Sequence, residues 1–418
     1  MRYALTVLIL TAATSAAAQK FEHLADRPPM GWNSWNTFAC DVTEKDVKAA
    51  ADAMVSSGMR AVGYQYVVVD DCWHGERDQA GFIQAHPKRF PSGMKALADY
   101  VHARGLRFGL YSDAGWKTCG GRPGSRGYEF QDALTYARWG VDYLKYDWCN
   151  TDKLNAEGAY LTMSRALRAA KRPVLLSICE WGNNEPWKWG AEVGHMWRTT
   201  GDITSCFDCV VGHGNWKSRG ILPIIDLQTE LREHAGPHHW NDPDMMEVGN
   251  GMSTGEDRAH FSLWAMMAAP LIAGNDLSTM SQTTRAILTN REVVAVDQDR
   301  LGIQGFVWLE RGDLQVWAKP LARGALALAF VNRGRSPETV EVVWTDHVIK
   351  DDLNKRHFDL GKHTYRIRDL WSHKHRGTTR KPLRTTLPAH DVMMLRLDPT
   401  GNAPKPGSAN ADHRVEMG

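Results

Sequence analysis

The chain lacks the short motifs by which nucleotide-binding enzymes are recognised. No GxGxxG lies between an expected strand and an expected helix, and no GKS or GKT is present, which argues against a dinucleotide-binding fold or a P-loop. The formal net charge is only +2 over 418 residues, too little to favour nucleic acid or an anionic membrane. Beyond the first 18 residues, no segment is long and apolar enough to span a bilayer. We therefore expect a globular protein without a nucleic-acid or membrane partner.

Cysteine is absent from the second half of the chain, and all seven cysteines lie within the first 209 residues. Four of them come just after, or at the end of, expected strands that follow one another along the chain. We expect these four to form two bridges between neighbouring loops, in a compartment where disulfides persist. The expected bridges are Cys40–Cys72 and Cys119–Cys149.

The remaining cysteines form a CxxC and a single residue. Cys206 and Cys209 could close a third, tight loop, which would leave Cys179 free. A CxxC is also found in redox sites and as half of a metal site. The chain has no second CxxC and no thioredoxin-like strand and helix after this one, which disfavours both alternatives.

Residues 1–18 have the pattern of a secretory signal. Arg2 precedes an apolar stretch, and three small residues (16–18) precede Gln19. The sequence therefore predicts an exported protein, either periplasmic or extracellular.

Tryptophan, by contrast, is abundant: the chain has 17 Trp but only 11 Tyr and 11 Phe. Flat indole faces stack on the C–H faces of sugars, so this composition favours a carbohydrate ligand. Core packing remains the more common role of any single Trp.

Several apolar runs predict buried strands that end in an acid, an amide or an aromatic residue. Segments with helical periodicity lie between them, so strands and helices alternate and the strands should pair in parallel. With three further candidates, the count reaches eight or nine strands. This predicts a (β/α)8 barrel over residues 19–300, with one candidate outside the barrel and the active site at the C-terminal ends of the strands. The candidates are 29–36, 64–73, 106–113, 142–150, 174–181, 195–202, 221–226, 238–245 and 269–276.

The pattern changes after residue 300. Short alternating runs are separated by Gly, Pro and Asp, which predicts an antiparallel β-sandwich over residues 301–397. Residues 398–418 lack apolar periodicity, and we expect them to be disordered.

The mouth of the expected barrel is rich in carboxylates. A glycosidase needs two: one that attacks or shields the oxocarbenium-like centre, and one that protonates the leaving oxygen. Any one of these acids could simply cap a helix or form a salt bridge. The presence of so many acids at the ends of the expected strands favours a catalytic site. The candidates are Asp70, Asp71, Asp113, Asp147, Glu180, Asp202, Asp226, Asp242 and Asp244.

Asp147 and Asp202 are the best candidates for the two roles. Lys145 lies two residues before Asp147, on the same face of the strand, and its ammonium would keep the carboxylate ionised as a nucleophile requires. Asp202 follows Gly201, and we expect it to be the more occluded carboxyl, with a raised pKa suited to proton donation. The two should flank a pyranose ring about 5–6 Å apart.

A metal-dependent enzyme or a phosphate-binding enzyme is the alternative interpretation of the predicted barrel and its carboxylates. The first expected strand has no HxH, and the side chains of His238 and His239 would point to opposite faces of a strand. The glycine-rich stretch 249–255 has no basic residue before Arg258, so a phosphate site is disfavoured.

Six ordered motifs closely resemble glycoside hydrolase family 27, the melibiase or α-galactosidase group. They are MGWNSWN (30–36), VVVDDCW (67–73), YLKYDWCN (143–150), CEW (179–181), WRTTGDI (197–203) and HWNDPDM (239–245). The resemblance covers about residues 27–395. It implies a barrel followed by a β-sandwich, a retaining mechanism, and no metal or organic cofactor.

The resemblance also implies a role for each matching residue. Asp147 resembles the nucleophile and Asp202 the acid/base, while Asp70 and Asp71 resemble the pair that binds the galactose hydroxyls at C4 and C6. Further sugar contacts are implied for Trp35, Tyr111, Lys145 and Arg198.

The pair Glu180–Trp181 falls where the family selects the group at C2 of the sugar. A bulky Glu180 resembles galactose-specific members rather than α-N-acetylgalactosaminidases, and Asp70 disfavours pentose-specific β-L-arabinopyranosidases. A sugar-binding module with a dead site is disfavoured because both catalytic acids are present. Residues 203–216 are longer than the corresponding stretch of the family and contain the additional cysteines Cys206 and Cys209. The resemblance implies that this stretch borders the leaving-group side. The natural α-galactoside substrate and the oligomeric state stay open.

Overall fold

The computed structural model describes residues 20–401, so the expected signal at 1–18 lies outside the described residues. An eight-stranded parallel sheet forms the first part of the chain, in the spatial order β11-β8-β7-β6-β5-β2-β1-β12. Its strands are β1 Met30–Asn33, β2 Tyr66–Val69, β5 Arg107–Asp113, β6 Tyr143–Asp147, β7 Leu175–Cys179, β8 Met196–Arg198, β11 Trp240–Asp242 and β12 Leu271–Ala273.

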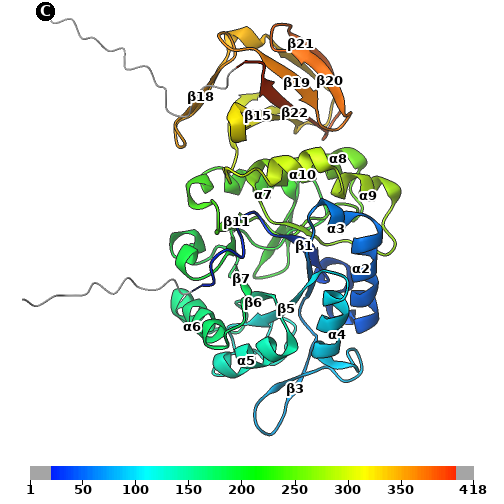
Figure 1. The fold of residues 1–418 in the computed structure, drawn as a ribbon, viewed down its shortest axis with the longest axis vertical. Helices are drawn as coiled ribbons and strands as arrows, with labels where there is room; N and C mark the ends of the chain where they lie inside the picture. The colour runs from blue at the N-terminus through cyan, green and yellow to red at the C-terminus, as the bar shows by residue number, and fades with distance from the viewer. Residues whose placement is uncertain (1–19, 402–418) are drawn as a thin grey trace, which may run out of the picture.

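The sheet closes on itself beyond β11. Met246 pairs in parallel with Ala273 of β12, and its N–H donates to the carbonyl of Ile272 at 2.7 Å. The sheet is therefore a barrel, as the alternation of strands and helices predicts, and the helices lie around its outside (Figure 1).

The helices begin at local sequence signals. The main-chain N–H of Thr43 donates to Asp46 Oδ2 at 2.9 Å, which forms a capping box at the start of α2. Asn155 caps α6 by accepting from Gly158 N–H. The helices that follow the strands are α2 Glu44–Ser56, α4 Gly93–His102, α5 Glu129–Trp139, α6 Ala156–Ala169, α7 Ile221–Gln228, α8 Thr254–Met267, α9 Gln282–Leu288 and α10 Arg291–Asp297; the single turns α1 Trp35–Phe38 and α3 Met59–Val62 are shorter.

The expected strand at 221–226 is in fact helical. This run forms the start of α7, and it is the candidate that lies outside the barrel. The residue Pro223 lies in the first helical turn, where a missing N–H breaks no helical hydrogen bond. The helix is buried on most of its surface, and such a helix has no polar face whose spacing would distinguish it from a buried strand.

Antiparallel sheets form the part of the chain after residue 300, as expected. The main sheet has the order β13-β14-β15-β22-β19-β20, and two further two-stranded sheets pair β16 with β21 and β17 with β18. The last strand continues through Asp398 and Pro399, two residues beyond the expected boundary, and residues 402–418 of the expected tail are not described. The strands are β13 Phe306–Arg311, β14 Leu314–Pro320, β15 Leu326–Asn332, β16 Glu338–Val342, β17 Val348–Asp351, β18 Arg356–Asp359, β19 Tyr365–Asp369, β20 Lys374–Thr378, β21 Leu383–Leu387 and β22 Val392–Pro399.

The β-sheet part packs on the barrel helix α8 and forms ion pairs with α7 and α10 (Figure 1). Lys319 of β14 is fully buried, and its ammonium donates to the carbonyl of Ala265 at 2.8 Å. Arg333 makes two hydrogen bonds to Asp226 of α7, at 2.8 and 2.7 Å. Asp226 therefore contributes to the contact between the barrel and the β-sheet part. The expectation that Asp226 lies at the barrel mouth is wrong.

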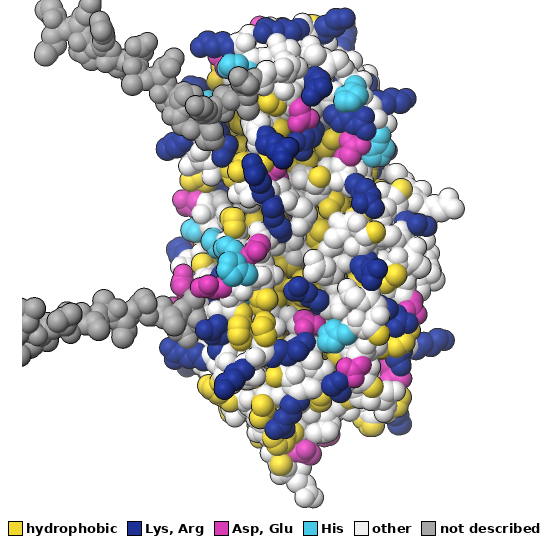
Figure 2. Space-filling view, in the orientation of Figure 1, with side chains coloured by type: hydrophobic (Ala, Val, Ile, Leu, Met, Phe, Trp, Pro, Cys, Tyr) yellow, Lys and Arg dark blue, Asp and Glu magenta, His cyan; other side chains and the backbone are white. Residues whose placement is uncertain are grey.

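Basic and acidic side chains are scattered over the face of the molecule shown in Figure 2. Within residues 20–401, every helix is too short or too polar to cross a bilayer.

Candidate active site

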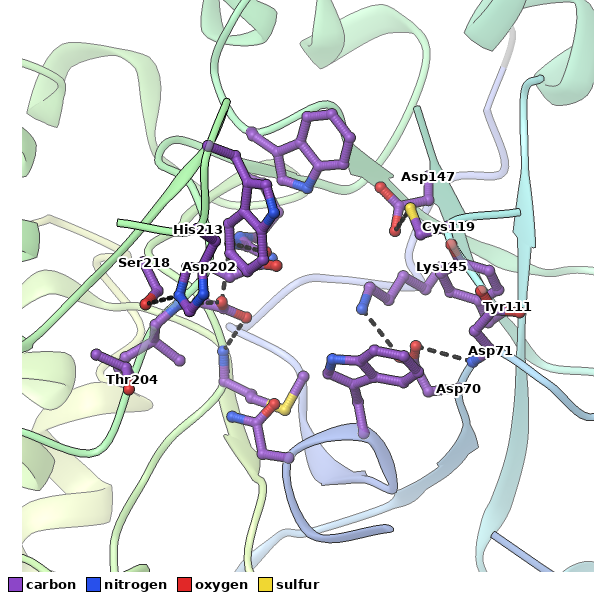
Figure 3. Close-up of a pocket in the computed structure, with 18 residues that line it drawn as sticks. Asp70, Asp71, Tyr111, Cys119, Lys145, Asp147, Asp202, Thr204, His213 and Ser218 are labelled. Atoms are coloured by element: carbon purple, nitrogen blue, oxygen red, sulfur yellow. Dashed lines mark hydrogen bonds and ion pairs between the residues drawn. The ribbon is translucent and has the colours of Figure 1, made fainter. Parts of the chain in front are cut away.

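A cavity of about 230 Å³ lies at the C-terminal ends of the barrel strands (Figure 3). Nine of the ten predicted catalytic and sugar-binding residues line it. The lining residues are Trp35, Asn36, Asp70, Asp71, Tyr111, Cys119, Lys145, Asp147, Trp181, Arg198, Asp202, Ile203, Thr204, His213, Trp216, Ser218, Asp244 and Met245.

Asp70 follows β2 and is held by two donors. Its Oδ2 accepts from the Asn33 side-chain amide at 2.6 Å and from the Lys145 ammonium at 2.9 Å. Burial opposes the charge on Lys145, but nearby carboxylates, Asp70 first among them, raise its pKa well above the ordinary value. The three side chains form a fixed polar wall whose charges suit the hydroxyl groups of a sugar.

Asp71 is fixed by main-chain donors from two different loops. Its Oδ1 accepts from Cys72 N–H and its Oδ2 from Gly120 N–H, both at 2.6 Å. A Cβ on Gly120 would lie 2.7 Å from the sulfur of Cys72 and 2.9 Å from Asp71 Oδ2. Only glycine therefore allows this approach. Burial raises the pKa of Asp71, and the main-chain donors oppose that shift.

Disulfides join the loops that carry these residues. Cys72 is bonded to Cys40, and Cys119 is bonded to Cys149, which follows β6. Cys179 is free and buried. The loop next to Asp71 and the loop after Asp147 are therefore each covalently linked to a neighbouring loop.

Asp147 ends β6 and is buried. Its Oδ1 accepts from the N–H of Trp148 at 2.9 Å. Burial raises the pKa of this carboxyl, and the positive charge of Lys145 opposes that rise. The expected influence of Lys145 is present, although its direct ion pair is with Asp70.

Asp202 stands on the other side of the cavity from Asp147 (Figure 3). The expectation that it is the more occluded carboxyl is wrong: its side chain is 42% exposed, whereas Asp147 is only 5% exposed. The reason is that Asp202 lies beyond the end of β8 in a loop, while Asp147 belongs to a buried strand. The buried guanidinium of Arg198 pairs with Asp202 at 3.1 Å and with Asp244 at 2.8 Å.

Tyr111 and the tryptophans complete the wall. The Tyr111 hydroxyl is buried and has no hydrogen-bond partner within the described residues, so it is available to a ligand hydroxyl. Trp181 lines the cavity with φ at 60°, a backbone region that is costly for a bulky residue and recurs at functional sites. Glu180 is not brought to the cavity: it is buried, and its Oε2 accepts from the N–H and side-chain amide of Asn184, both at 2.6 Å.

Sequence reasoning assigned no role to several lining residues. Asp244 was counted among the acids of the mouth, and it does line the cavity, where it pairs with Arg198. The others come mainly from residues 203–218, a stretch without apolar periodicity. The only signals there were its greater length than the family pattern and the additional cysteines Cys206 and Cys209.

Among residues 20–401, two groups of side chains have spacing suited to a metal, but neither is a ligand set inside the cavity. Asp113 lies beside Cys119 and Cys149, whose sulfurs are joined in a disulfide and are not thiolates. His23, Asp26 and His238 lie before β11, at the opposite end of the barrel from the cavity.

The arrangement is suited to glycosyl transfer. Two carboxylates face one cavity from opposite sides, one buried and hydrogen-bonded, the other open to water. Polar side chains and aromatic surfaces line the same cavity. Together these features meet the requirements of glycoside hydrolysis.

Comparisons with known proteins agree with this geometry. Residues 27–299 match the family described as "Alpha galactosidase A", and residues 311–397 match the "Alpha galactosidase C-terminal beta sandwich domain". Alpha-galactosidase A of Cellvibrio japonicus is 58% identical over 393 residues, which cover 94% of this chain and 97% of that one.

Solved structures show the same fold. Alpha-galactosidase I from Mortierella vinacea has a TM-score of 0.83 at 36% identity, covering 91% of this chain and 98% of that one. The α-galactosidase from Saccharomyces cerevisiae solved with raffinose has a TM-score of 0.82 at 30% identity, covering 90% and 98%. The chain therefore belongs to the α-galactosidase A family, glycoside hydrolase family 27, and is a glycoside hydrolase.

Proposed function

We propose that this protein is a secreted, retaining α-galactosidase that releases terminal α-D-galactosyl residues by double displacement. In the first step, an oxygen of Asp147 attacks the anomeric carbon, and Asp202 gives its proton to the leaving oxygen. In the second, Asp202 takes a proton from water, the water oxygen attacks the same carbon, and the Asp147 carboxylate leaves. Galactose is released with its original anomeric configuration.

The observation that supports this mechanism is the contrast between the two carboxylates. Asp147 is buried and aimed by the N–H of Trp148, as a nucleophile needs if it is to attack in one direction. Asp202 is 42% exposed, so water can reach it for the second step. A bound substrate would cover Asp202 and keep water away from it during the first step. Water would then reach Asp202 only in the second step, after the leaving group has departed.

The polar wall supports galactose as the sugar. Asp70 and Asp71 present fixed carboxylate oxygens, and Lys145 supplies a donor beside them. Such adjacent acceptors and a donor suit the C4 and C6 hydroxyls of galactose. The names of the relatives support the same specificity, and the raffinose bound in the S. cerevisiae protein supports an oligosaccharide as substrate.

Secretion is part of the proposal. It is supported by the signal-like pattern of residues 1–18 and by the three disulfides of the described part of the chain, which persist in oxidising compartments. Comparing the protein in cell extract, periplasm and culture medium, with the N-terminus of the mature chain sequenced, tests this part.

An azide-rescue assay tests the mechanism. We expect Asp147→Ala to lower kcat on an aryl α-galactoside by several orders of magnitude, on the order of 10⁴. Added azide should restore turnover by attacking from the vacated side, giving the β-galactosyl azide. Asp226→Ala is the matched control, since this acid lies outside the cavity, and it should keep full activity. Near-native turnover of Asp147→Ala would reject the mechanism.

The sugar is tested separately with the unaltered protein. In a panel of aryl glycosides, the α-galactoside should be the best substrate, with the first-formed product anomer followed by NMR. A preference for the β-L-arabinopyranoside or the α-N-acetylgalactosaminide would reject the galactose assignment, and a β-configured first product would reject retention.

A further inference from the structure

Two stacked aromatic rings stand at the rim of the cavity. The rings of His213 and Trp216 lie 4.0 Å apart with 19° between their planes, and both line the cavity. Trp216 is 48% exposed, although burying an indole in a core stabilises a protein strongly. The pair is held in place yet keeps a large apolar surface in contact with solvent.

The pair belongs to a hairpin made by β9 Val210–Gly212 and β10 Lys217–Arg219. Val211 opposes Ser218, and His213 N–H donates to the Trp216 carbonyl at 2.9 Å. Because side chains alternate along each strand, His213, Trp216 and Ser218 share one face. All three of these residues line the cavity.

The hairpin is tied to the catalytic loop. The N–H of Arg219 donates to the Asp202 carbonyl at 2.9 Å, and Cys206–Cys209 closes the chain between Asp202 and the hairpin. The His213 ring is itself fixed by a 2.9 Å hydrogen bond to the Ser218 hydroxyl. The rings therefore keep a fixed position relative to Asp202.

We propose that the His213–Trp216 stack is the binding site for the leaving-group sugar, a neutral hexopyranose joined to the α-galactosyl residue. This inference rests on the proposed function, because it takes Asp202 as the acid. The acid must touch the leaving oxygen, so the leaving group lies on the side of Asp202. In Figure 3, Asp202 lies together with His213, Ser218 and Thr204, across the cavity from Asp70 and Asp147.

The chemistry of this side suits a sugar ring. The indole offers a flat face for the C–H groups of a pyranose, and the hydroxyls of Ser218 and Thr204 lie nearby on the same cavity wall for its hydroxyl groups. A few polar groups beside an aromatic face orient such a ligand.

A second, polar cavity adjoins the first and is the competing place for the leaving sugar. It shares Asn36 and Thr204 with the first cavity and is otherwise lined by residues such as Glu247, Asn275 and Thr279. It has no aromatic side chain in its lining, so a sugar there would rely on hydrogen bonds alone.

The test compares two substrates in each variant: an α-linked galactosyl-glucose disaccharide and α-galactosyl fluoride, whose single-atom leaving group cannot reach the hairpin. In Trp216→Ala, kcat/KM for the disaccharide should fall about tenfold more than kcat/KM for the fluoride. Trp216→Phe should restore most of the difference, and His213→Ala should give a smaller differential loss. Trp116→Ala is the control, because Trp116 is 56% exposed and does not line the cavity.

Each outcome decides the proposal. An unchanged ratio of the two kcat/KM values in Trp216→Ala, or a proportional fall for both substrates, overturns it. A differential loss in Thr279→Ala without one in Trp216→Ala assigns the leaving sugar to the second cavity and also overturns it. If the unaltered protein hydrolyses neither substrate, the proposed function itself fails, and this result is distinct because it appears before any substitution is made.

Discussion

The ammonium of Lys145 on β6 forms an ion pair of 2.9 Å with Asp70, which follows β2. The two strands are not neighbours, since β5 lies between them. Lys145 thus connects the cavity wall that contains Asp70 to the strand that carries Asp147. This one side chain fixes Asp70 by an ion pair and also opposes the rise that burial causes in the pKa of Asp147.

Replacing Lys145 should change the pH dependence of catalysis. A nucleophile works only when ionised, and the positive charge of Lys145 lowers the pKa of Asp147 against the effect of burial. In Lys145→Met that opposing effect is lost and the pKa rises, so the acid limb of the kcat/KM profile should move to higher pH by about one unit. The profile is measured on an aryl α-galactoside; Lys45→Met, on the exposed surface of α2, should leave the limb in place. A limb that does not move would contradict the electrostatic role of Lys145.

Asp202→Asn should separate the two steps of the reaction. A substrate with a good leaving group needs little help from an acid, but the second step still needs a base. We expect kcat to fall by about 10²–10⁴ and the galactosyl-enzyme to accumulate. Intact-protein mass spectrometry should show one added galactosyl group, and peptide mapping should place it on Asp147. A label on any other residue would rule out the assigned nucleophile.

Gly120→Ala should damage the binding of galactose. The added Cβ would lie 2.7 Å from the Cys72 sulfur and 2.9 Å from Asp71 Oδ2, both in a buried and crosslinked site, so Asp71 has to move. We expect KM to rise at least about tenfold and thermal stability to fall, with a cost of about 1–3 kcal/mol. Gly255→Ala is the matched control, because its Cβ would meet Asp391 at an ordinary 3.4 Å. Equal effects in both variants would refute this explanation.

The Cys40–Cys72 bridge should stabilise the fold more than Cys206–Cys209. The first closes a separation of 32 residues and the second a separation of 3, and the unfolded chain loses more entropy when a longer loop is closed. Replacing both cysteines by serine should cost about 4 kcal/mol for the first pair and about 2 kcal/mol for the second. Urea unfolding of the two double variants measures the difference. An equal loss would show that native contacts, rather than loop closure, dominate.

The sequence alone determined the parts of the fold that depend on local chemistry. Apolar runs that end in acids place Asp70 and Asp147 at the ends of strands, and a Thr–Asp pair at 43 and 46 begins α2. Parallel pairing then brings all such strand ends to one face, because every crossover returns to the same edge of the barrel. Nine of the 18 residues that line the cavity were predicted to be catalytic or sugar-binding in this way or from the family resemblance.

Tertiary structure decided which of several equally plausible side chains reach the cavity. Trp181 lines it while the adjacent Glu180 bonds to Asn184, because the direction of a side chain in a loop depends on φ and ψ values that composition does not encode. Asp226 pairs with Arg333, more than a hundred residues away, and the exposure of Asp202 depends on a loop without periodicity. Sequence periodicity indicates only whether a segment is buried. The residues that a side chain contacts depend on packing between segments that are distant in the chain.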